Sequence, residues 1–260
     1  MSLTREEFIK LKVENENEKI GYLSYMNCPK CKNKGVIYFE ANCEINALEC
    51  NCVSIRKMIQ ELEKCGMKKE VFNNYTLEKF TTDQEWQKVV KTKFVKYLEN
   101  FKKDEEFRNW LVISAQSGSG KSHLCTAILK EMMIDGKKGK YMLWLDEVQK
   151  IIALKKSVHY LNQQKFDDIM YELKNVDILY IDDFLKNYND KKIDEIDIAY
   201  EIINARYNNN KITIISTEVL KEQLENINMA ICGRINERAN GYWTQLKYDK
   251  ERNYRMKERG

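Results

Sequence analysis

The 260-residue chain has one proline, two histidines and no run of 18 uncharged apolar residues. Without such a run a membrane-spanning helix of ordinary length is excluded, and we expect no membrane contact. The first 17 residues are too acidic and polar for a secretory signal peptide, so we expect a cytoplasmic protein. In a reducing compartment the eight cysteines bind metal or pack more often than they form disulfides.

A large excess of one charge is also absent. The chain has 44 Lys and Arg residues against 40 Asp and Glu residues, so its net charge is only +4 although 32% of its residues are charged. This balance permits a local basic surface without requiring a nucleic-acid partner. With 43% hydrophobic residues, the chain can bury one sizeable core and a small additional module.

Two close pairs of cysteines lie near the N-terminus. Cys28-Pro29-Lys30-Cys31, followed by Gly35, has the form of a zinc knuckle, and Cys50-Asn51-Cys52 supplies the second pair. Four thiolates from two short loops form the tetrahedral set that Zn²⁺ prefers. We therefore expect one Zn²⁺, which also stabilises a region too small to bury much core by itself. The expected ligands are Cys28, Cys31, Cys50 and Cys52.

The scarcity of histidine argues against a mixed cysteine and histidine site, because His123 and His159 lie far away in the sequence. Cys43 stays open as a rival ligand for one position. The other thiols are isolated, and we expect them to pack in the interior. These are Cys65, Cys125 and Cys232.

A glycine-rich loop lies between an apolar segment and an apolar helix. Residues 110–113 predict a buried strand and residues 121–133 a helix, which is the context of a phosphate-binding P-loop. Backbone N–H groups would surround the β- and γ-phosphates of ATP, with Lys121 adding charge and Ser122 ligating Mg²⁺. The usual pattern has Gly where Ala115 stands, and a positive φ there would be costly. The expected nucleotide-binding residues are Ala115, Gln116, Ser117, Gly118, Ser119, Gly120, Lys121, Ser122 and His123.

A second apolar run, residues 177–181, ends in two carboxylates, the first of them 61 residues after Lys121. In a parallel sheet, a strand beside the P-loop strand delivers such carboxylates to the phosphates. We expect Asp182 to hold Mg²⁺ and Asp183 to polarise the attacking water. Asp183 is one methylene shorter than the Glu found in many such ATPases, which favours slow turnover.

Helices and strands alternate along the chain. Thr4 and Glu7 predict a capping box at the start of a first helix, and the last of the predicted strands is an edge strand. Such alternation is typical of a parallel α/β sheet. We predict helices over 53–64, 83–102, 146–155, 163–174 and 193–208, and strands over 141–145, 212–216 and 242–248.

With these motifs in this order, the chain resembles bacterial and phage helicase loaders of the DnaC/DnaI type. These are AAA+ ATPases of the initiator clade, related to the transposition ATPase IstB. The resemblance covers residues 25–256 and rests on the cysteine-rich module, the connector Tyr75-Thr76-Leu77-Glu78-Lys79-Phe80 and the string Gly118-Ser119-Gly120-Lys121-Ser122-His123-Leu124. It implies a P-loop AAA+ ATPase core with a parallel sheet and no full helical lid, preceded by a small zinc-binding domain.

The resemblance also implies catalytic residues. Residues 214–218 match the sensor-1 strand, but Glu218 stands where the family has Asn, so we expect Thr217 to make the polar contact. Residues 232–238 match the segment of the arginine finger, which reaches the γ-phosphate of a neighbouring subunit. Arg234 is the better match and Arg238 the rival.

Two further groups of basic residues follow from the resemblance. Near the C-terminus, Arg255 is favoured over Arg252 as the sensor-2 arginine. Residues 146–174 match the helical insertion of the clade, where Lys155 and Lys156 are the expected contacts to single-stranded DNA. Binding through such groups is sensitive to salt and independent of sequence.

The resemblance divides the chain into a zinc-binding helicase-interaction domain (1–70), a connector (71–82) and an AAA+ ATPase domain (83–260). It implies a slow ATPase, dependent on assembly or DNA, that uses ATP, Mg²⁺ and Zn²⁺ and self-assembles through its ATPase domain. The implied function is to deliver a DnaB-type hexameric helicase onto single-stranded DNA during replication initiation. Two alternatives stay open: an IstB-like transposition ATPase, and a non-hydrolysing nucleotide-binding zinc adaptor.

Overall fold

The computed structural model describes residues 4–64, 73–189, 192–254 and 256. Its centre is a sheet of five strands, all paired in parallel. In spatial order the strands are β4 (Gly139–Leu143), β5 (Ile178–Asp182), β6 (Ile212–Thr217), β3 (Leu111–Ser114) and β7 (Trp243–Gln245). The three inner strands are buried along their whole length, as expected for parallel strands that are covered on both faces.

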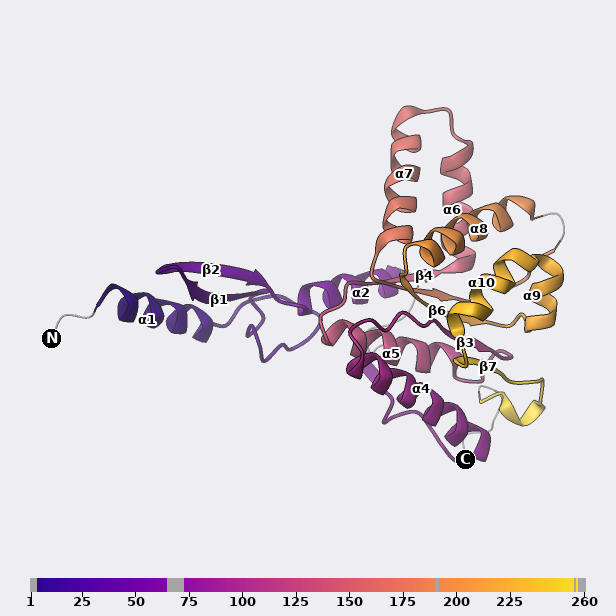
Figure 1. Cartoon of the computed structure of the whole chain (residues 1–260), viewed down its shortest axis with the longest axis horizontal. Helices are drawn as coiled ribbons and strands as arrows, with labels where there is room; N and C mark the ends of the chain where they lie inside the picture. The colour runs from indigo at the N-terminus through magenta and orange to yellow at the C-terminus, as the bar shows by residue number, and fades with distance from the viewer. Residues whose placement is uncertain (1–3, 65–72, 190–191, 255, 257–260) are drawn as a thin grey trace.

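Helices cover both faces of this sheet (Figure 1). On one face lie α2 (Cys52–Lys64), α4 (Glu85–Lys103) and α5 (Lys121–Ile134). On the other face lie α6 (Trp144–Lys156), α7 (Tyr160–Asn175), α8 (Ile193–Asn208), α9 (Lys221–Ile227) and α10 (Met229–Ala239). The buried side chains form one apolar cluster on each face. The predicted α/β fold with a parallel sheet is confirmed.

The predicted amphipathic helix over 83–102 appears as α4. Its apolar stripe packs against the sheet and α5, and the Tyr97 hydroxyl at its centre donates a hydrogen bond to the Asn109 carbonyl at 2.8 Å. Among the predicted packing cysteines, Cys125 and Cys232 are buried, whereas Cys65 lies outside the described residues.

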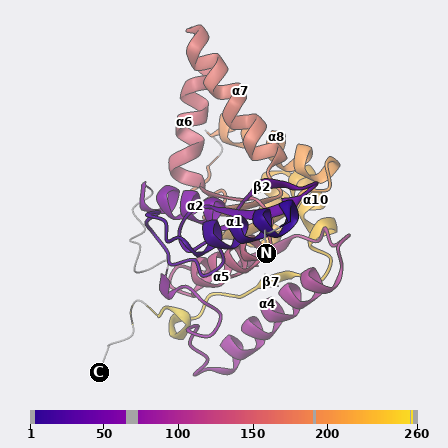
Figure 2. The ribbon, with the colours of Figure 1, turned by 90° about the vertical axis from the view of Figure 1, so that its left-hand side faces the viewer.

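The helices α6 and α7 form a hairpin that projects away from the sheet (Figures 1 and 2). Both helices begin earlier than predicted. The strand predicted over 141–145 is displaced by two residues, because Trp144 already begins α6. Its ring is fully buried and packs edge-on against Phe184, with the ring centroids 5.0 Å apart. The apolar run therefore continues from strand into helix without a polar boundary.

The N-terminal module consists of α1 (Arg5–Glu18) and an antiparallel hairpin of β1 (Val36–Ala41) and β2 (Glu44–Glu49). It extends to one side of the sheet (Figure 1). The predicted capping box is present, with the Glu7 amide donating to Thr4 Oγ1 at 3.2 Å and the Thr4 amide to Glu7 Oε2 at 2.8 Å. The hairpin itself has no counterpart in the prediction.

Helix α2 joins this module to the central sheet, since it packs against β4 and α5. Its side chains Ile55, Met58 and Ile59 belong to the same buried cluster as Phe94 and Leu124. The division of the chain into three segments stays a prediction. No helix among the described residues is long and apolar enough to cross a membrane.

Candidate functional site

The loop between β3 and α5 turns sharply at two glycines. Gly118 and Gly120 have φ values of 78° and 84°. A Cβ on Gly118 would lie 2.1 Å from the Asn253 side chain, and a Cβ on Gly120 would lie 2.7 Å from the Phe80 ring, so neither position accepts a larger residue. Ala115 is buried and has no positive φ. Ala115 is therefore free of the strain that a positive φ would cause, because Gly118 and Gly120 make the turn.

Lys121 begins α5 and is only 5% exposed. Its Nζ donates to the Gln116 carbonyl at 2.9 Å and lies 3.9 Å from Glu218 Oε1. Burial lowers the pKa of Lys121, although the nearby carboxylates raise it in part. A buried ammonium group at a helix N-terminus, where the helix dipole is positive, favours the arrival of an anion.

Asp182, at the end of β5, is buried and accepts several hydrogen bonds. Ser122 Oγ donates to its Oδ1 at 3.1 Å, and the Tyr141 hydroxyl donates to its Oδ2 at 3.1 Å. The Ser216 hydroxyl and the Asp183 amide also donate to Oδ1. The structure thus brings together the two residues predicted to hold Mg²⁺, and a hydroxyl and a carboxylate are oxygen ligands that suit this ion.

Asp183 has a left-handed backbone with a φ of 55°, and its carboxylate pairs with Lys186 at 3.0 Å. Lys186 also lies 3.1 Å from Glu218. Burial lowers the pKa of Lys186, but hydrogen bonds with these two carboxylates raise it above its usual value. Thr217 is buried, and its hydroxyl donates to the Phe184 carbonyl at 2.7 Å. The geometry therefore favours Glu218 over Thr217 as the side chain that faces the loop.

These residues enclose a polar cavity of about 200 Å³. A smaller hollow of about 100 Å³ adjoins it, and both are lined by Gly118, Gly120 and His123. Aromatic side chains line the smaller hollow, which suits a planar base, while the cavity suits phosphate groups. The cavity is lined by Tyr75, Ser117, Gly118, Gly120, Lys121, Ser122, His123, Asp183, Lys186 and Glu218, and the hollow adds Phe80, Thr81, Trp86, Gln87, Ser119 and Tyr254.

The connector before α4 contributes to both spaces. The Tyr75 ring stacks on His123 with the centroids 4.7 Å apart, and His123 Nε2 lies 2.7 Å from the Thr76 carbonyl. Burial lowers the pKa of His123, so the ring is neutral at pH 7 and donates its N–H to this carbonyl. His123 thus fixes the connector against the P-loop helix.

The segment after β7, where the resemblance places the sensor-2 arginine, crosses the P-loop. The Gln116 side chain forms two hydrogen bonds with the backbone of Asp249, at 2.9 and 2.8 Å, and the Tyr254 amide donates to the Gly118 carbonyl at 3.0 Å. Arg252 lies over the Trp86 ring. The predicted sensor-2 residue, Arg255, lies outside the described residues.

The predicted arginine finger lies elsewhere, on α10. Arg234 Nε donates to Asn204 Oδ1 at 2.9 Å, and the guanidinium lies over the rings of Tyr200 and Tyr207. Arg238 donates to the Tyr207 carbonyl at 2.6 Å. Neither arginine is among the described residues that line the cavity. The structure thus does not bring Arg234 to the P-loop of its own chain.

The four cysteines of the two pairs form a separate buried cluster. Their sulfur atoms all lie within 4.8 Å of one another, with 3.8 Å between Cys28 and Cys50 and 3.5 Å between Cys31 and Cys52. Tetrahedral Zn–S bonds of about 2.3 Å place the sulfurs about 3.8 Å apart, so the cluster fits Zn²⁺. Cys43, the rival ligand, is exposed in the turn between β1 and β2 and lies outside the cluster.

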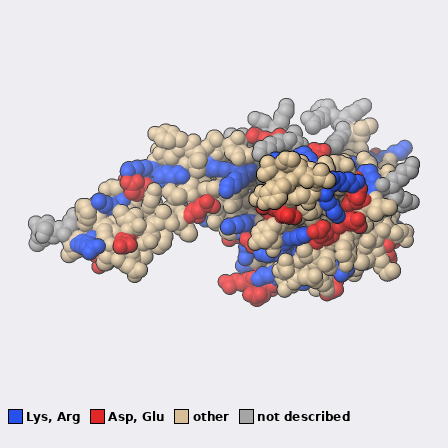
Figure 3. All heavy atoms as spheres, turned by 90° about the horizontal axis from the view of Figure 1, so that it is seen from above, with Lys and Arg blue, Asp and Glu red and all other residues tan. Residues whose placement is uncertain are grey.

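The lysines predicted to contact DNA lie at the end of α6, near the tip of the hairpin. Lys156 pairs with Asp194 at 2.5 Å, and both side chains are largely exposed. Exposed Val158 and Tyr160 follow at the tip. Seen from above, basic and acidic side chains are interspersed over the molecule (Figure 3), so any basic contact surface on this face is local.

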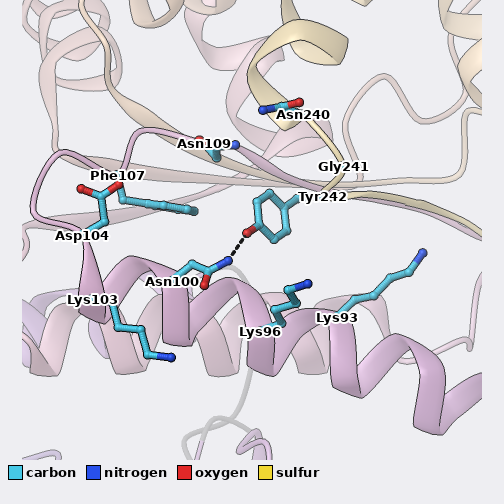
Figure 4. Close-up of a pocket in the computed structure, with 10 residues that line it drawn as sticks. All are labelled: Lys93, Lys96, Asn100, Lys103, Asp104, Phe107, Asn109, Asn240, Gly241 and Tyr242. Carbon is cyan, nitrogen blue, oxygen red and sulfur yellow. Dashed lines mark hydrogen bonds between the residues drawn. The ribbon is translucent and has the colours of Figure 1, made fainter.

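A larger open hollow of about 620 Å³ lies beside α4 and shares no residue with the P-loop cavity. Lys93, Lys96 and Lys103 extend along its α4 side, and Tyr242, which accepts a hydrogen bond from Asn100, lies on the other side (Figure 4). The hollow has no glycine-rich loop to surround phosphates, so we place the candidate nucleotide site at the smaller cavity.

A family comparison matches residues 72–239 to the bacterial DnaA ATPase domain. Among curated relatives from Bacillus subtilis (strain 168), the uncharacterized protein YqaM is 27% identical over 219 residues, which are 80% of this chain and 66% of YqaM. The phage-like element PBSX protein XkdC is 26% identical over 233 residues, which are 86% of this chain and 84% of XkdC.

Solved structures share the fold. A replication initiator DnaA bound to AMPPCP and single-stranded DNA superposes with a TM-score of 0.52 and 22% identity, over 68% of this chain and 50% of that one. The DnaC helicase loader superposes with a TM-score of 0.51 and 22% identity, over 68% of this chain and 98% of the loader. DnaI superposes with a TM-score of 0.53 and 18% identity, over 70% of this chain and 93% of DnaI. The predicted resemblance to AAA+ proteins of the DnaC/DnaI type is confirmed, and the chain spans half of the DnaA structure.

Proposed function

The chain belongs to the family of bacterial DnaA ATPase domains, and we propose that it is an ATP-switched loader that delivers a DnaB-type hexameric helicase onto single-stranded DNA. One observation carries the proposal: Lys121 and Ser122 line a polar cavity beside a glycine-rich loop, and Ser122 donates a hydrogen bond to buried Asp182. The cavity accounts for ATP binding. Delivery of a helicase is the proposed role because the DnaC structure, which shares the fold, is a helicase loader.

In this proposal, the loop amides and Lys121 bind the β- and γ-phosphates. Ser122 and Asp182 would hold Mg²⁺, which would supply positive charge to neutralise the charge on the phosphates. Asp183 orients and polarises the attacking water. Because Asp183 is held by Lys186 and has the shorter side chain, we expect slow turnover that depends on assembly or DNA.

The N-terminal module is the proposed docking site for the helicase. Four cysteines would hold Zn²⁺ and fix the two loops, because little apolar surface is buried in the hairpin. Several apolar side chains of the module face solvent, among them Tyr22, Phe39 and Leu48. Exposed apolar side chains gathered in one small module are typical of a protein-binding surface.

Leu48→Asp should reduce capture of the DnaB-type helicase at least about tenfold, because a charge in an apolar contact opposes docking. The matched control is Val89→Asp on α4, which is exposed but lies outside the module. Capture from defined mixtures of helicase and transposase is measured for both variants and the unchanged chain. Capture of the transposase alone supports the IstB-like alternative. Capture of the helicase without any ATP hydrolysis supports the non-hydrolysing adaptor.

Arg234→Ala should bind ATP almost normally yet hydrolyse it about a hundredfold more slowly, because a finger stabilises charge mainly during phosphoryl transfer. Lys121→Ala supplies an intact arginine, and Arg234→Ala supplies an intact P-loop. A mixture of the two variants should recover part of the activity at concentrations where subunits associate. Wild-type turnover by Arg234→Ala alone contradicts the role and makes Arg238 the next candidate.

Lys155→Gln combined with Lys156→Gln should weaken binding of single-stranded DNA. The steepness with which the logarithm of the binding constant falls with the logarithm of salt concentration should decrease by about 1.4, or about 0.7 for each lost phosphate contact. Exposed Tyr160 beside them offers a ring on which a base can stack. Binding is measured against salt concentration with a labelled oligonucleotide. The matched control is Lys93→Gln with Lys96→Gln in the hollow beside α4. A loss confined to this control would place the strand along α4 instead.

A further inference from the structure

One carboxylate lies between two lysines in the lining of the candidate nucleotide cavity. Glu218 Oε1 is 3.1 Å from Lys186 Nζ and 3.9 Å from Lys121 Nζ. All three side chains line the cavity, and Lys121 belongs to the P-loop itself. A carboxylate placed between two ammonium groups resembles, in charge and shape, two oxygens of a phosphate group. Glu218 is the residue that departs from the family's Asn.

The position of Lys186 is imposed by a strained loop. Asp183, Leu185 and Asn187 all have left-handed φ values, of 55°, 53° and 57°. A left-handed Leu is costly and persists only where surrounding contacts enforce it. Here Leu185 is fully buried, and the Phe184 amide donates to the Ser216 carbonyl of β6 at 2.9 Å. The anchored loop directs Lys186 back to the cavity.

Lys186 also holds the predicted water-polarising residue, because Asp183 Oδ2 lies 3.0 Å from its Nζ. The same ammonium group therefore binds two carboxylates that have different roles. Glu218 lies toward Lys121 and the phosphate end of the loop, and Asp183 follows the Mg²⁺ candidate Asp182. An anion that draws Lys186 toward Lys121 would leave Asp183 without this partner.

We propose that Lys186 is a second cation for the γ-phosphate, and that Glu218 is an internal stand-in for this phosphate when none is bound. This inference rests on the proposed ATP-binding function. With ADP, Glu218 stays between Lys121 and Lys186. With ATP, the γ-phosphate takes both lysines, Glu218 leaves because like charges repel, and Lys186 is drawn away from Asp183. The charged pair thus makes the site distinguish the two nucleotides.

The two residues have opposite predicted effects on this discrimination, measured as the affinities of Mg–ATP and Mg–ADP for the full chain. Lys186→Ala should weaken ATP binding about tenfold and ADP binding less than about twofold, since one charge-assisted contact to the γ-phosphate is lost. Lys186→Arg should restore part of the ATP affinity. Glu218→Gln should tighten ATP binding about threefold or more and leave ADP unchanged, because the competing charge is removed. The matched control is Lys211→Ala, which breaks a 3.1 Å ion pair with Asp177 at the opposite end of the sheet.

Equal weakening of both nucleotides by Lys186→Ala, or no change in either, overturns the role of Lys186. Weaker ATP binding in Glu218→Gln overturns its role as a stand-in. If the pair had only a structural role, both variants would bind both ATP and ADP more weakly. Opposite changes of the ATP affinity in the two variants therefore distinguish the proposal from a structural role. If the unchanged chain binds neither nucleotide, the proposed function fails and this inference fails with it. Normal binding by the unchanged chain, combined with an unaltered ratio of affinities in the variants, rejects this inference alone.

Discussion

Lys121→Ala is expected to lower the affinity for ATP by about a hundredfold or more. The side chain is buried, its nearest carboxylate is 3.9 Å away, and its one hydrogen bond among the described contacts goes to a backbone carbonyl. Since Glu218, its counter-ion, is 3.9 Å away, Lys121 gains a closer partner from a phosphate, and hydrogen bonds to charged groups contribute up to about 3 kcal/mol. This free energy corresponds to about a hundredfold in affinity.

Calorimetric titration of the full chain with Mg–ATP measures this loss, and circular dichroism checks that the variant is folded. The matched control is Lys138→Ala, an exposed lysine shortly after the same helix. Unchanged ATP affinity in Lys121→Ala would reject the P-loop assignment. Asp183→Asn separates binding from chemistry: it should keep ATP affinity and stop turnover, because an amide polarises water poorly. Full turnover in this variant removes Asp183 from the mechanism.

Removal of the metal is expected to unfold the N-terminal module. Strand β2 is largely exposed, so apolar burial contributes little to the hairpin. The cysteine cluster is the main buried feature between the two loops. Structural Zn²⁺ typically contributes about 10–16 kcal/mol of apparent binding free energy at pH 7. Protein purified without metal-affinity resin should therefore contain about one Zn²⁺ per chain. A chelator should remove this Zn²⁺ and thereby unfold the hairpin.

Elemental analysis and limited proteolysis test this expectation. Cys50→Ser should lose the metal and expose the hairpin to protease. Cys43→Ser is the matched control, since its thiol lies in the same hairpin but outside the cluster. A metal-free chain with a protease-resistant hairpin refutes the site. Loss of zinc in Cys43→Ser, with retention in Cys50→Ser, would show that the ligand set is different.

The central part of the fold could be predicted because its signals are local. The P-loop and the Asp182 strand follow motifs of fixed spacing, and α4 carries its apolar residues at helical intervals. The hairpin of β1 and β2 was missed because thiols, and not alternating apolar residues, hold it together. The bounds predicted for strand β4 are wrong because Trp144 is apolar and fits a buried strand as well as a buried helix. The apolar pattern therefore does not show where the strand ends and α6 begins.

The candidate site was predicted only in part for a similar reason. Side chains within a motif could be found, whereas Lys186 and Tyr254 reach the P-loop through irregular backbone. Lys186 depends on a loop with three left-handed residues, and Leu185 among them is a residue type that gives no turn signal. Its position four residues after Asp182 was the one available indication. The sequence shows Glu218 in place of Asn, but only the fold shows that Lys186 is its partner.

Helix α2 has a mechanical consequence. It begins at Cys52, in the cysteine cluster, and packs against β4 and against α5, the helix that begins at Lys121. A force applied to the N-terminal module would act along α2 on β4 and α5. A shift of α5 would in turn move the loop at its start. Tension exerted by a bound partner would reach the phosphate end of the cavity without direct contact.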